Sequence, residues 1–392
     1  MLITRLTSGI NTPMGKINKH KIIHLSSVHK PFDIRIFHKE CRSLAENNFN
    51  VSLIIQHDKD EVIDKVRIIP ITKELNRFYR IFRTTWQVYV KARAENGYVY
   101  HFHDPELIPI GICLKINGKK VIYDVHENVP DQILDKHWLP KGLRWLISNG
   151  VKFLEWASSR YFFDGIVTAT DFIGKRFPLK KTIVVKNFPK LSSQSEELTS
   201  VPYKQRSPHV IYVGGITEQR GIKEMIKAIE LVPKQRGANL HLAGEFVPHN
   251  LFLEAQEMAG WDRVTFFGLM PHKKVLTMFQ SVRIGIAILH PTKQYIESLP
   301  IKLFEYMSAG LPVIVSNFPL WKEIIEKHNC GILVDPFDSK RVAQAIEWLL
   351  QNPDEAEEMG KRGQEAVRRF YNWEGEEKKL LQFYKKIVSC DS

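Results

Sequence analysis

Short apolar runs alternate with helical patterns along this sequence, and the alternation occurs twice. Such runs are typical of strands buried on both faces, and their alternation with helices is typical of parallel α/β sheets. In the first half the expected strands are 21–27, 50–56, 65–71, 99–103, 119–125, 165–170 and 182–186. In the second half they are 209–215, 239–245, 263–269, 283–289, 311–316 and 331–336. The pattern therefore predicts two separate α/β sheets.

A polar, serine-rich stretch at 191–207 separates the two sets of strands. We interpret it as a linker between an N-terminal Rossmann-like domain at 1–190 and a C-terminal one at 208–371. A length of 392 residues suits two hydrophobic cores. The last segment, 372–392, begins as an amphipathic helix that we expect to pack back across the domain junction. Two such domains form a cleft between the carboxyl ends of their sheets, where ligands bind in folds of this kind.

Positive charge is concentrated in the first half of the chain. The whole sequence carries +13, and residues 1–200 hold 31 Lys+Arg against 20 Asp+Glu, or +11, which leaves +2 for the rest. One interpretation is an anionic partner, either an acidic membrane surface or a phosphorylated acceptor. The other is a solvated basic surface without a partner. We predict no nucleic-acid partner, because the sequence has no zinc finger, RNP motif or basic heptad region.

The composition is that of a globular protein, with 44% hydrophobic and 25% charged residues. No run offers the ~20 apolar residues that span a bilayer, and the polar N-terminus lacks the apolar core of a secretory signal. The four cysteines are scattered, without the CxxC spacing of a zinc site. We therefore expect a cytoplasmic protein, at most peripheral at the inner face of the membrane, with reduced thiols and no structural zinc.

The most informative stretch begins at Glu297. Pro300 suits the first turn of a helix and Gly310 suits its end, so the stretch is expected to fold as loop, helix and strand. Glu305 then lies inside the helix, and Glu297 lies in the loop before it. A helix N-terminus offers unpaired N–H groups to a pyrophosphate, and carboxylates on either side accept hydrogen bonds from ribose and sugar hydroxyls.

This stretch resembles the EX7E motif of the family 4 retaining glycosyltransferases, and its form is similar to that in enzymes of capsule, lipopolysaccharide and other surface-glycan synthesis. The resemblance implies the GT-B fold, in which two Rossmann-like domains face each other across a cleft. It implies a nucleotide-sugar donor, with UDP as the favoured base, and a glycan or lipid-linked acceptor. It also implies that Glu305 binds the ribose hydroxyls, that Glu297 contacts the donor sugar, and that Lys302 lies near the diphosphate.

A glycine pair, Gly214 and Gly215, follows the first strand of the second half. Glycines let a backbone approach a phosphate closely. The loop is similar to the family's phosphate loop, in which an arginine and a lysine neutralise the diphosphate. Here Arg220 stands at the lysine position, and the arginine position falls on Gly215 or Ile216. Either Arg220 and Lys302 share the diphosphate, or the first domain supplies a further cation, or catalysis is weaker than is usual in the family.

Two strands of the first half end in histidine and acidic residues. One runs into His103 and Asp104, and the next runs into His126 and Glu127. The second resembles the family position whose histidine contacts the donor sugar, so we expect His126 and Glu297 to be the catalytic residues. The acceptor-side candidates here are His103, Asp104 and Glu127. Alternatively, His103 and Asp104 hold the loop that carries His126. For each histidine, the other alternative is a structural role in which neighbouring backbone groups satisfy its hydrogen bonds.

The loop after the first strand carries Asp33 and Arg35, where many relatives have a glycine pair. We count both residues as acceptor-side candidates. The alternative is a local ion pair between them, which would contribute little to stability.

The segment 141–163 is helical in period and rich in Trp, Leu and Phe, with lysine and arginine interspersed. A helix of the hydrophobic core is the favoured interpretation. The alternative is a helix on an anionic membrane surface, with aromatic residues at the interface and cations on the lipid phosphates.

Transfer from a nucleotide sugar builds negative charge on the leaving diphosphate, so the catalyst must offer cations and N–H donors there. Arg220, Lys302 and helix N-termini meet this need, and we expect neither a cofactor nor a divalent metal. The sequence offers no separate carboxylate for a covalent intermediate, so we expect substitution on one face with retention of configuration. A nucleotide-sugar 2-epimerase of the same fold, or a catalytically silent scaffold or lectin-like protein, is the alternative.

Overall fold

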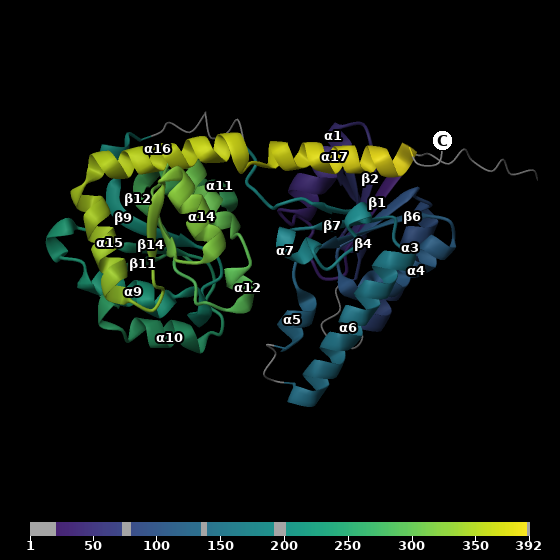
Figure 1. Ribbon diagram of the computed structural model, residues 1–392, viewed down its shortest axis with the longest axis horizontal. Helices are drawn as coiled ribbons and strands as arrows, with labels where there is room; N and C mark the ends of the chain where they lie inside the picture. The colour runs from purple at the N-terminus through teal and green to yellow at the C-terminus, as the bar shows by residue number, and fades with distance from the viewer. Residues whose placement is uncertain (1–20, 73–79, 135–138, 192–200, 390–392) are drawn as a thin grey trace, which may run out of the picture. The chain divides into compact units, whose positions relative to one another are not determined.

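The computed structural model describes residues 21–72, 80–134, 139–191 and 201–389 (Figure 1). Most of the expected linker, 192–200, lies outside these described residues. The domain boundaries expected at 190 and 208 therefore stay a prediction.

Contacts along the chain define two compact units. The first unit comprises the residues up to Asp124, Leu154–Ile166 and the residues from Phe383 onward, and the second comprises Val125–Phe153 and Val167–Gln382. The carboxyl ends of two strands in the first sheet, β6 and β7, fall in the second unit. The loops that follow these two strands are therefore described with the second unit.

The first sheet has eight strands in the order β3-β4-β2-β1-β5-β6-β7-β8. The strands are β1 (Lys21–Leu25), β2 (Asn50–Gln56), β3 (Glu61–Ile63), β4 (Val66–Ile71), β5 (Val99–Phe102), β6 (Lys120–Val125), β7 (Gly165–Thr168) and β8 (Thr182–Val184). Strand β1 pairs in parallel with β2 and β5, and the strand order reverses there. The sequence prediction missed only β3, a three-residue antiparallel edge strand that is partly exposed and has no apolar run.

Short helices follow most of these strands. They are η1 (Ile36–Cys41), α1 (Arg42–Glu46), α3 (Thr85–Glu95), η3 (Pro105–Leu107), α4 (Ile108–Ile116), α5 (Val129–Leu134), α6 (Lys141–Tyr161) and α7 (Asp171–Gly174). Strands β1, β2 and β5 are almost entirely buried. Burial on both faces explains why they appear in the sequence as continuous apolar runs.

Helix α6 does not bury its apolar side chains. Trp145, Leu146 and Phe153 are 65%, 62% and 68% exposed, whereas Ser148 and Glu155 are buried. The favoured prediction of a core helix is therefore wrong, because the helix turns its polar residues inward. Within the described ranges, no helix has both the length and the apolar character needed to cross a membrane.

The second sheet has six strands in the order β11-β10-β9-β12-β13-β14. The strands are β9 (Ser207–Val213), β10 (Leu240–Ala243), β11 (Val264–Phe266), β12 (Val282–Ala287), β13 (Val313–Ser316) and β14 (Gly331–Val334). All the recorded pairings are parallel. The order reverses between β9 and β12, so the loops after these two strands flank a crevice at the carboxyl edge of the sheet.

Helices cover both faces of the second sheet. They are η6 (Glu218–Arg220), α9 (Ile222–Leu231), α10 (Asn250–Gln256), α11 (His272–Ser281), α12 (Lys293–Ile296), α13 (Ile301–Ser308), α14 (Pro319–His328), α15 (Ser339–Gln351) and α16 (Pro353–Phe370). Along β9, Val210 and Tyr212 pack with α9, α10 and α15, whereas Ile211 packs with α11, α13 and α14. This alternation is the two-residue period of a strand between two layers of helices. The prediction of two parallel α/β sheets is confirmed.

The last helix, α17 (Trp373–Ser389), contributes to both units. In the second unit, the Glu376 carboxylate accepts a hydrogen bond of 3.0 Å from the Lys186 backbone N–H. In the first unit, Tyr384 is buried, and its hydroxyl lies 2.6 Å from His101 Nδ1.

Candidate functional site

The loop that follows β9 lies where the strand order of the second sheet reverses. Gly214 has a φ of +126°, which side chains rarely adopt. Gly244 packs on it so closely that a Cβ there would lie 1.9 Å from the Gly214 carbonyl oxygen. The backbone of this loop is therefore bare of side chains, as the phosphate-loop prediction requires.

Lys302 extends from α13 to this loop. A Cβ on Gly214 would lie 3.1 Å from Lys302 Nζ. The Nζ atom is buried, has no hydrogen-bond partner among the described residues, and lies 3.8 Å from the centre of the Tyr212 ring. Burial and, after it, the positive charge of Arg220 hold the pKa of Lys302 well below its usual value. A buried ammonium without an acceptor is costly. An anionic ligand would supply the hydrogen-bond acceptor and the negative charge that Lys302 lacks.

Arg220 ends η6 beside the same glycines. Its Nη1 donates a hydrogen bond of 3.1 Å to the Gly215 carbonyl, and its Nε donates one of 3.3 Å to the Tyr295 hydroxyl. The next residue, Gly221, has a φ of +70°, and a Cβ there would lie 2.0 Å from the Ile288 carbonyl oxygen. Only glycine fits this close approach, so it fixes where the arginine leaves the loop. The structure thus brings together the four residues predicted to bind the donor diphosphate, Gly214, Gly215, Arg220 and Lys302.

The two glutamates of the motif lie on different elements. Glu305 is on α13, with its Oε1 3.4 Å from His272 Nε2. Glu297 directly follows α12, a one-turn helix where the sequence predicted only a loop. Pro300 is the residue before α13, rather than part of the first turn as expected, because its ψ of 131° is extended.

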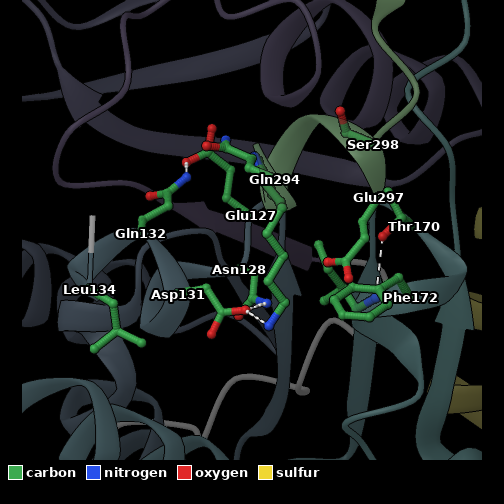
Figure 2. A pocket seen from close by; sticks show the side chains of 13 residues that line it. Glu127, Asn128, Asp131, Gln132, Leu134, Thr170, Phe172, Gln294, Glu297 and Ser298 are labelled. Carbon is green, nitrogen blue, oxygen red and sulfur yellow. Dashed lines mark hydrogen bonds and ion pairs between the residues drawn. The ribbon is translucent and has the colours of Figure 1, made fainter. Parts of the chain in front are cut away.

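A cavity of about 260 Å³ opens beside α12. It is lined by His126, Glu127, Asn128, Asp131, Gln132, Leu134, Thr170, Phe172, Ile173, Lys293, Gln294, Glu297 and Ser298, all from the second unit. Figure 2 shows the Glu297 carboxylate beside the Phe172 ring, with Asp131 and Gln132 of α5 and the preceding Glu127 and Asn128 also at the cavity. The predicted catalytic pair, His126 and Glu297, therefore lines one cavity, together with the acceptor-side candidate Glu127.

Two features shape the electrostatics of this cavity. Lys293 Nζ lies 2.7 Å from Asp131 Oδ2, so one lysine and one carboxylate neutralise each other in its wall. Burial raises the pKa of Glu297, and the nearby charge of Lys293 opposes that rise. On the other side of α12, Tyr295 contacts Arg220, so a single turn of helix joins the cavity to the phosphate loop.

In the first unit, Asp104 follows β5 and is held by the end of the neighbouring strand. Ser26 Oγ and the Ser27 backbone N–H donate to Asp104 Oδ2 at 2.9 and 2.6 Å, and His29 Nδ1 lies 3.0 Å from Oδ1. Burial alone would raise the pKa of Asp104, but these partners, His29 first, hold it at about 2. The two serines were missed as site residues. Their position directly after β1, which pairs with β5, could have indicated that they lie beside Asp104.

His103 is buried and hydrogen-bonded to side chains. Its Nδ1 lies 3.2 Å from Asp124 Oδ2, and its Nε2 lies 2.9 Å from His24 Nδ1. The predicted alternative, a histidine satisfied by neighbouring backbone, therefore does not describe it.

Asp33 binds backbone N–H groups, whereas the Arg35 side chain binds Asp124. Asp33 Oδ1 accepts hydrogen bonds from the backbone N–H groups of Arg35 and Ile36, at 2.8 and 2.9 Å, and so begins η1. The Arg35 guanidinium is buried and donates to both oxygens of Asp124, at 3.1 and 2.9 Å. Arg35 therefore lies inside the first domain rather than on a surface that an acceptor reaches.

The sequence is similar to those of known proteins, mainly in its second half. Residues 193–366 match the family described as glycosyl transferases group 1. The alpha-D-kanosaminyltransferase of Streptomyces kanamyceticus is 29% identical over 183 residues, which is 46% of this chain and 46% of that protein. Spore coat protein SA of Bacillus subtilis is 23% identical over 250 residues, which is 56% of this chain and 64% of that protein. The chain thus matches about half to two thirds of the length of these relatives.

Solved structures match nearly the whole chain. Sucrose-phosphate synthase (tll1590) from Thermosynechococcus elongatus has a TM-score of 0.73 at 19% identity, over 94% of this chain and 99% of that chain. WaaG, a glycosyltransferase involved in lipopolysaccharide biosynthesis, has a TM-score of 0.70 at 14% identity, over 94% and 100%. At these identities the likeness establishes the GT-B fold, with its two parallel-sheet α/β domains. The GT-B fold of the whole chain and the match of residues 193–366 to the group 1 glycosyltransferases agree with the family 4 resemblance of its motif.

Proposed function

We propose that this chain is a retaining glycosyltransferase that moves a sugar from a nucleotide-diphosphate sugar, with UDP as the base, to a glycan or lipid-linked acceptor in surface-polysaccharide synthesis. The observation that carries the proposal is Lys302 Nζ, which is buried against Gly214 and has no hydrogen-bond acceptor in the described part of the chain. Arg220 lies beside the same glycines. Two cations at a bare backbone loop, at the reversal point of a parallel sheet, suit a diphosphate.

The proposed roles follow from these positions. As the bond between sugar and diphosphate breaks, negative charge grows on the leaving oxygen, and Lys302 and Arg220 stabilise it. The Glu305 carboxylate accepts hydrogen bonds from the ribose hydroxyls. Glu297 and His126, which line the cavity beside α12, contact the donor sugar. The acceptor attacks from the face that the leaving group occupied, and no divalent metal is needed at the diphosphate.

A solved structure supports the choice of base. Anabaena Alr3699/HepE, in complex with UDP-glucose, has a TM-score of 0.67 at 13% identity, over 93% of this chain. The UDP-glucose is a ligand of that protein, and a UDP-sugar donor for this chain is part of the proposal. Of the acceptor-side candidates, Glu127 is exposed, whereas Asp104 is buried and pairs with the partly exposed His29. Glu127 and His29 are the proposed contacts for the acceptor.

We also propose that the protein works at the inner, cytoplasmic face of an anionic membrane, with α6 on the lipid surface. The helix exposes Trp145, Leu146 and Phe153, while Lys141 and Lys152 on it are also exposed. Aromatic and aliphatic side chains beside lysines suit the boundary between acyl chains and phosphates.

The donor proposal is tested with a panel of UDP- and GDP-sugars, measuring release of the nucleoside diphosphate by the wild type and by Lys302→Met. We expect release from one UDP-sugar, with or without added Mg²⁺, and its loss in the variant. Lys322→Met, at a half-exposed lysine that pairs with Glu326, is the matched control. A UDP-sugar whose C2 configuration changes without release of UDP would establish the epimerase instead. Failure of every donor to react or to raise the melting temperature would favour the silent scaffold.

The membrane proposal is tested by co-sedimentation with vesicles of phosphatidylcholine, with and without phosphatidylglycerol. We expect binding only to the anionic vesicles, and weaker binding for Trp145→Ser with Phe153→Ser. Equal sedimentation of wild type and variant would remove α6 as the contact. The same substitutions leave the donor site untouched, so nucleotide binding serves as the control.

A further inference from the structure

Three histidines of the first domain stack side by side in its interior. His24 on β1 lies directly opposite His101 on β5, and His103 follows two residues later on the same face of the strand. The ring centroids of each pair are 4.7 to 5.2 Å apart, and all three rings are buried. Nothing in the proposed transfer of a sugar uses His24 or His101. Burying three imidazoles together is costly, because each has polar nitrogens that need partners.

Glu40 on η1 completes the group. It is fully buried, and neither of its carboxylate oxygens accepts a hydrogen bond from the described residues. Oε1 lies 2.9 Å from Arg35 Nε in an ion pair, and Oε2 lies 4.0 Å from His101 Nδ1. On His101, the other ring nitrogen, Nε2, is buried without a hydrogen-bond partner in the described chain. Two of the four side chains thus have buried polar atoms without a hydrogen bond.

The charges of the group do not balance. Arg35 is held by both oxygens of Asp124, so the buried Glu40 adds a second carboxylate to a single guanidinium. Burial and then the charge of Asp124 raise the pKa of Glu40 well above its usual value. For His24 and His101, burial lowers the pKa well below its usual value. Two buried carboxylates thus lie beside one guanidinium, and a cation bound at Glu40 would add positive charge to the group.

We propose that His24, Glu40, His101 and His103 together bind one divalent cation of the zinc type. Each residue offers one ligand atom, and these atoms all lie within 4.8 Å of one another. Three imidazoles and a carboxylate form a donor set suited to Zn²⁺, which binds four ligands tetrahedrally. The scattered cysteines predicted no structural zinc, but cysteine spacing carries no information on histidines that separate strands bring together.

The neighbours of the group are those of a metal site. His103 Nδ1 faces Asp124 Oδ2 at 3.2 Å, while its Nε2 lies 2.9 Å from His24 Nδ1. The Tyr384 hydroxyl lies 2.6 Å from His101 Nδ1 and 3.4 Å from His24 Nε2. Ligand histidines typically turn one nitrogen to the metal and the other to a carboxylate or hydroxyl, which sets their orientation. A cation here would tie β1, β5 and η1 together beneath Asp104.

The test is the metal content of the protein, purified without a polyhistidine tag and without metal-affinity resin. We expect about one equivalent of zinc per chain by elemental analysis. After prolonged dialysis against a chelator, Co²⁺ titration should give the intense visible absorption of a tetrahedral site, and Zn²⁺ should raise the melting temperature. No metal in the protein, no such spectrum and no thermal shift would together overturn the proposal, and the group would then be a hydrogen-bonded network that holds a proton.

Variants locate the site. Glu40→Gln and His101→Gln should lower the affinity for Co²⁺ by at least 10–100-fold, the loss typical of a lesser change in the surroundings of a metal. His328→Gln is the matched control, because His328 Nε2 also contacts a tyrosine hydroxyl, that of Tyr371 at 3.1 Å, in the second domain. Undiminished Co²⁺ binding in both cluster variants would place the metal elsewhere and overturn the assignment. Because these measurements need no sugar donor, their failure is distinct from failure of the proposed transfer.

Discussion

In the first domain, Arg35 is buried between two carboxylates, 2.9 Å from Glu40 and 2.9 Å from Asp124. In the second domain, Lys302 Nζ is also buried, but no described residue offers it a hydrogen-bond acceptor, and it lies beside another cation, Arg220. Both charges lie near the carboxyl edge of a parallel sheet, close to the point where the strand order reverses. In the first domain, carboxylates surround Arg35. In the second domain, Lys302 faces a glycine loop that has no side chains.

The difference separates charges that hold the fold from charges that serve a ligand. A buried pair contributes to the fold, since removal of one partner leaves the other uncompensated. A buried cation without a partner lowers stability in the absence of a ligand, so its presence indicates a site that an anion completes. The comparison therefore predicts opposite responses to substitution in the two domains.

The largest expected effect is on stability in the first domain. Asp124→Ala removes the two carboxylate oxygens that accept hydrogen bonds from the buried Arg35 guanidinium, although Glu40 stays beside it, and removes a partner of His103. We expect the free energy of unfolding to fall by about 3–5 kcal/mol, as when a buried ion pair is broken. The shift of the urea unfolding midpoint measures it.

An exposed pair of the same chemistry in the same domain is the control for this loss. Arg67 binds both oxygens of Asp60, at 3.1 and 2.8 Å, but both side chains are nearly half exposed. Asp60→Ala should therefore cost at most about 1 kcal/mol. Equal losses of unfolding free energy in the two variants would mean that the buried pair of Arg35 stabilises the fold no more than the exposed pair of Arg67.

The second prediction concerns activity. Lys302→Met keeps most of the side-chain volume and removes the unpaired ammonium. We expect kcat/KM for the nucleotide sugar to fall by about 10²–10³-fold, as when one group that stabilises a developing anion is lost. The free energy of unfolding should stay the same or increase, because no buried partner is abandoned. A clear loss of stability would show that the lysine holds the fold, and would break the comparison.

The fold could be predicted almost completely because its strands are buried on both faces. Such strands appear as uninterrupted apolar runs, and thirteen of the fourteen strands found among the described residues were predicted. The segment 141–163 was the main error, because the sequence shows that a helix is apolar but not which of its faces turns inward. In α6 the buried positions include Ser148 and Glu155, whose carboxylate accepts a hydrogen bond of 3.0 Å from the buried Tyr123 hydroxyl.

The site could be predicted in part, for a physical reason. Gly214, Arg220 and Lys302 belong to motifs in which residue type and spacing are fixed by the approach of a phosphate. The partners of Asp104 come instead from β1, far away in the sequence, and only the strand order places Ser26 and Ser27 beside it. Pairing between distant strands is information that local patterns do not carry.

The third prediction separates recognition of ribose from recognition of the diphosphate. Glu305→Gln weakens the acceptor of the proposed ribose hydrogen bonds, so the affinity for UDP should fall by about tenfold, or 1.4 kcal/mol. The affinity for inorganic pyrophosphate should not change, whereas Lys302→Met should weaken both ligands. Isothermal titration of each variant gives the affinities, with Glu326→Gln as an exposed control. An equal effect of Glu305→Gln on pyrophosphate would assign the carboxylate to the phosphate loop.

The smallest expected effect is a proton taken up when UDP binds. Burial first and the charge of Arg220 second lower the pKa of Lys302 well below its usual value, so part of the free protein holds a neutral amine. A bound diphosphate favours the ammonium form and raises this pKa, so binding takes up a proton between the two pKa values, and affinity falls as pH rises through this interval.

Titration calorimetry in two buffers of different ionisation enthalpy measures that proton. At pH about 8 the diphosphate itself is fully ionised, since its last proton has a pKa of roughly 6, and it does not contribute. Uptake should vanish in Lys302→Met, where no amine remains to be protonated. Uptake that persists in this variant would mean that another group gains the proton, and that Lys302 is already an ammonium in the free protein. Arg35 and Lys302 would then both be charged in the free protein, and they would differ only in whether carboxylates surround them.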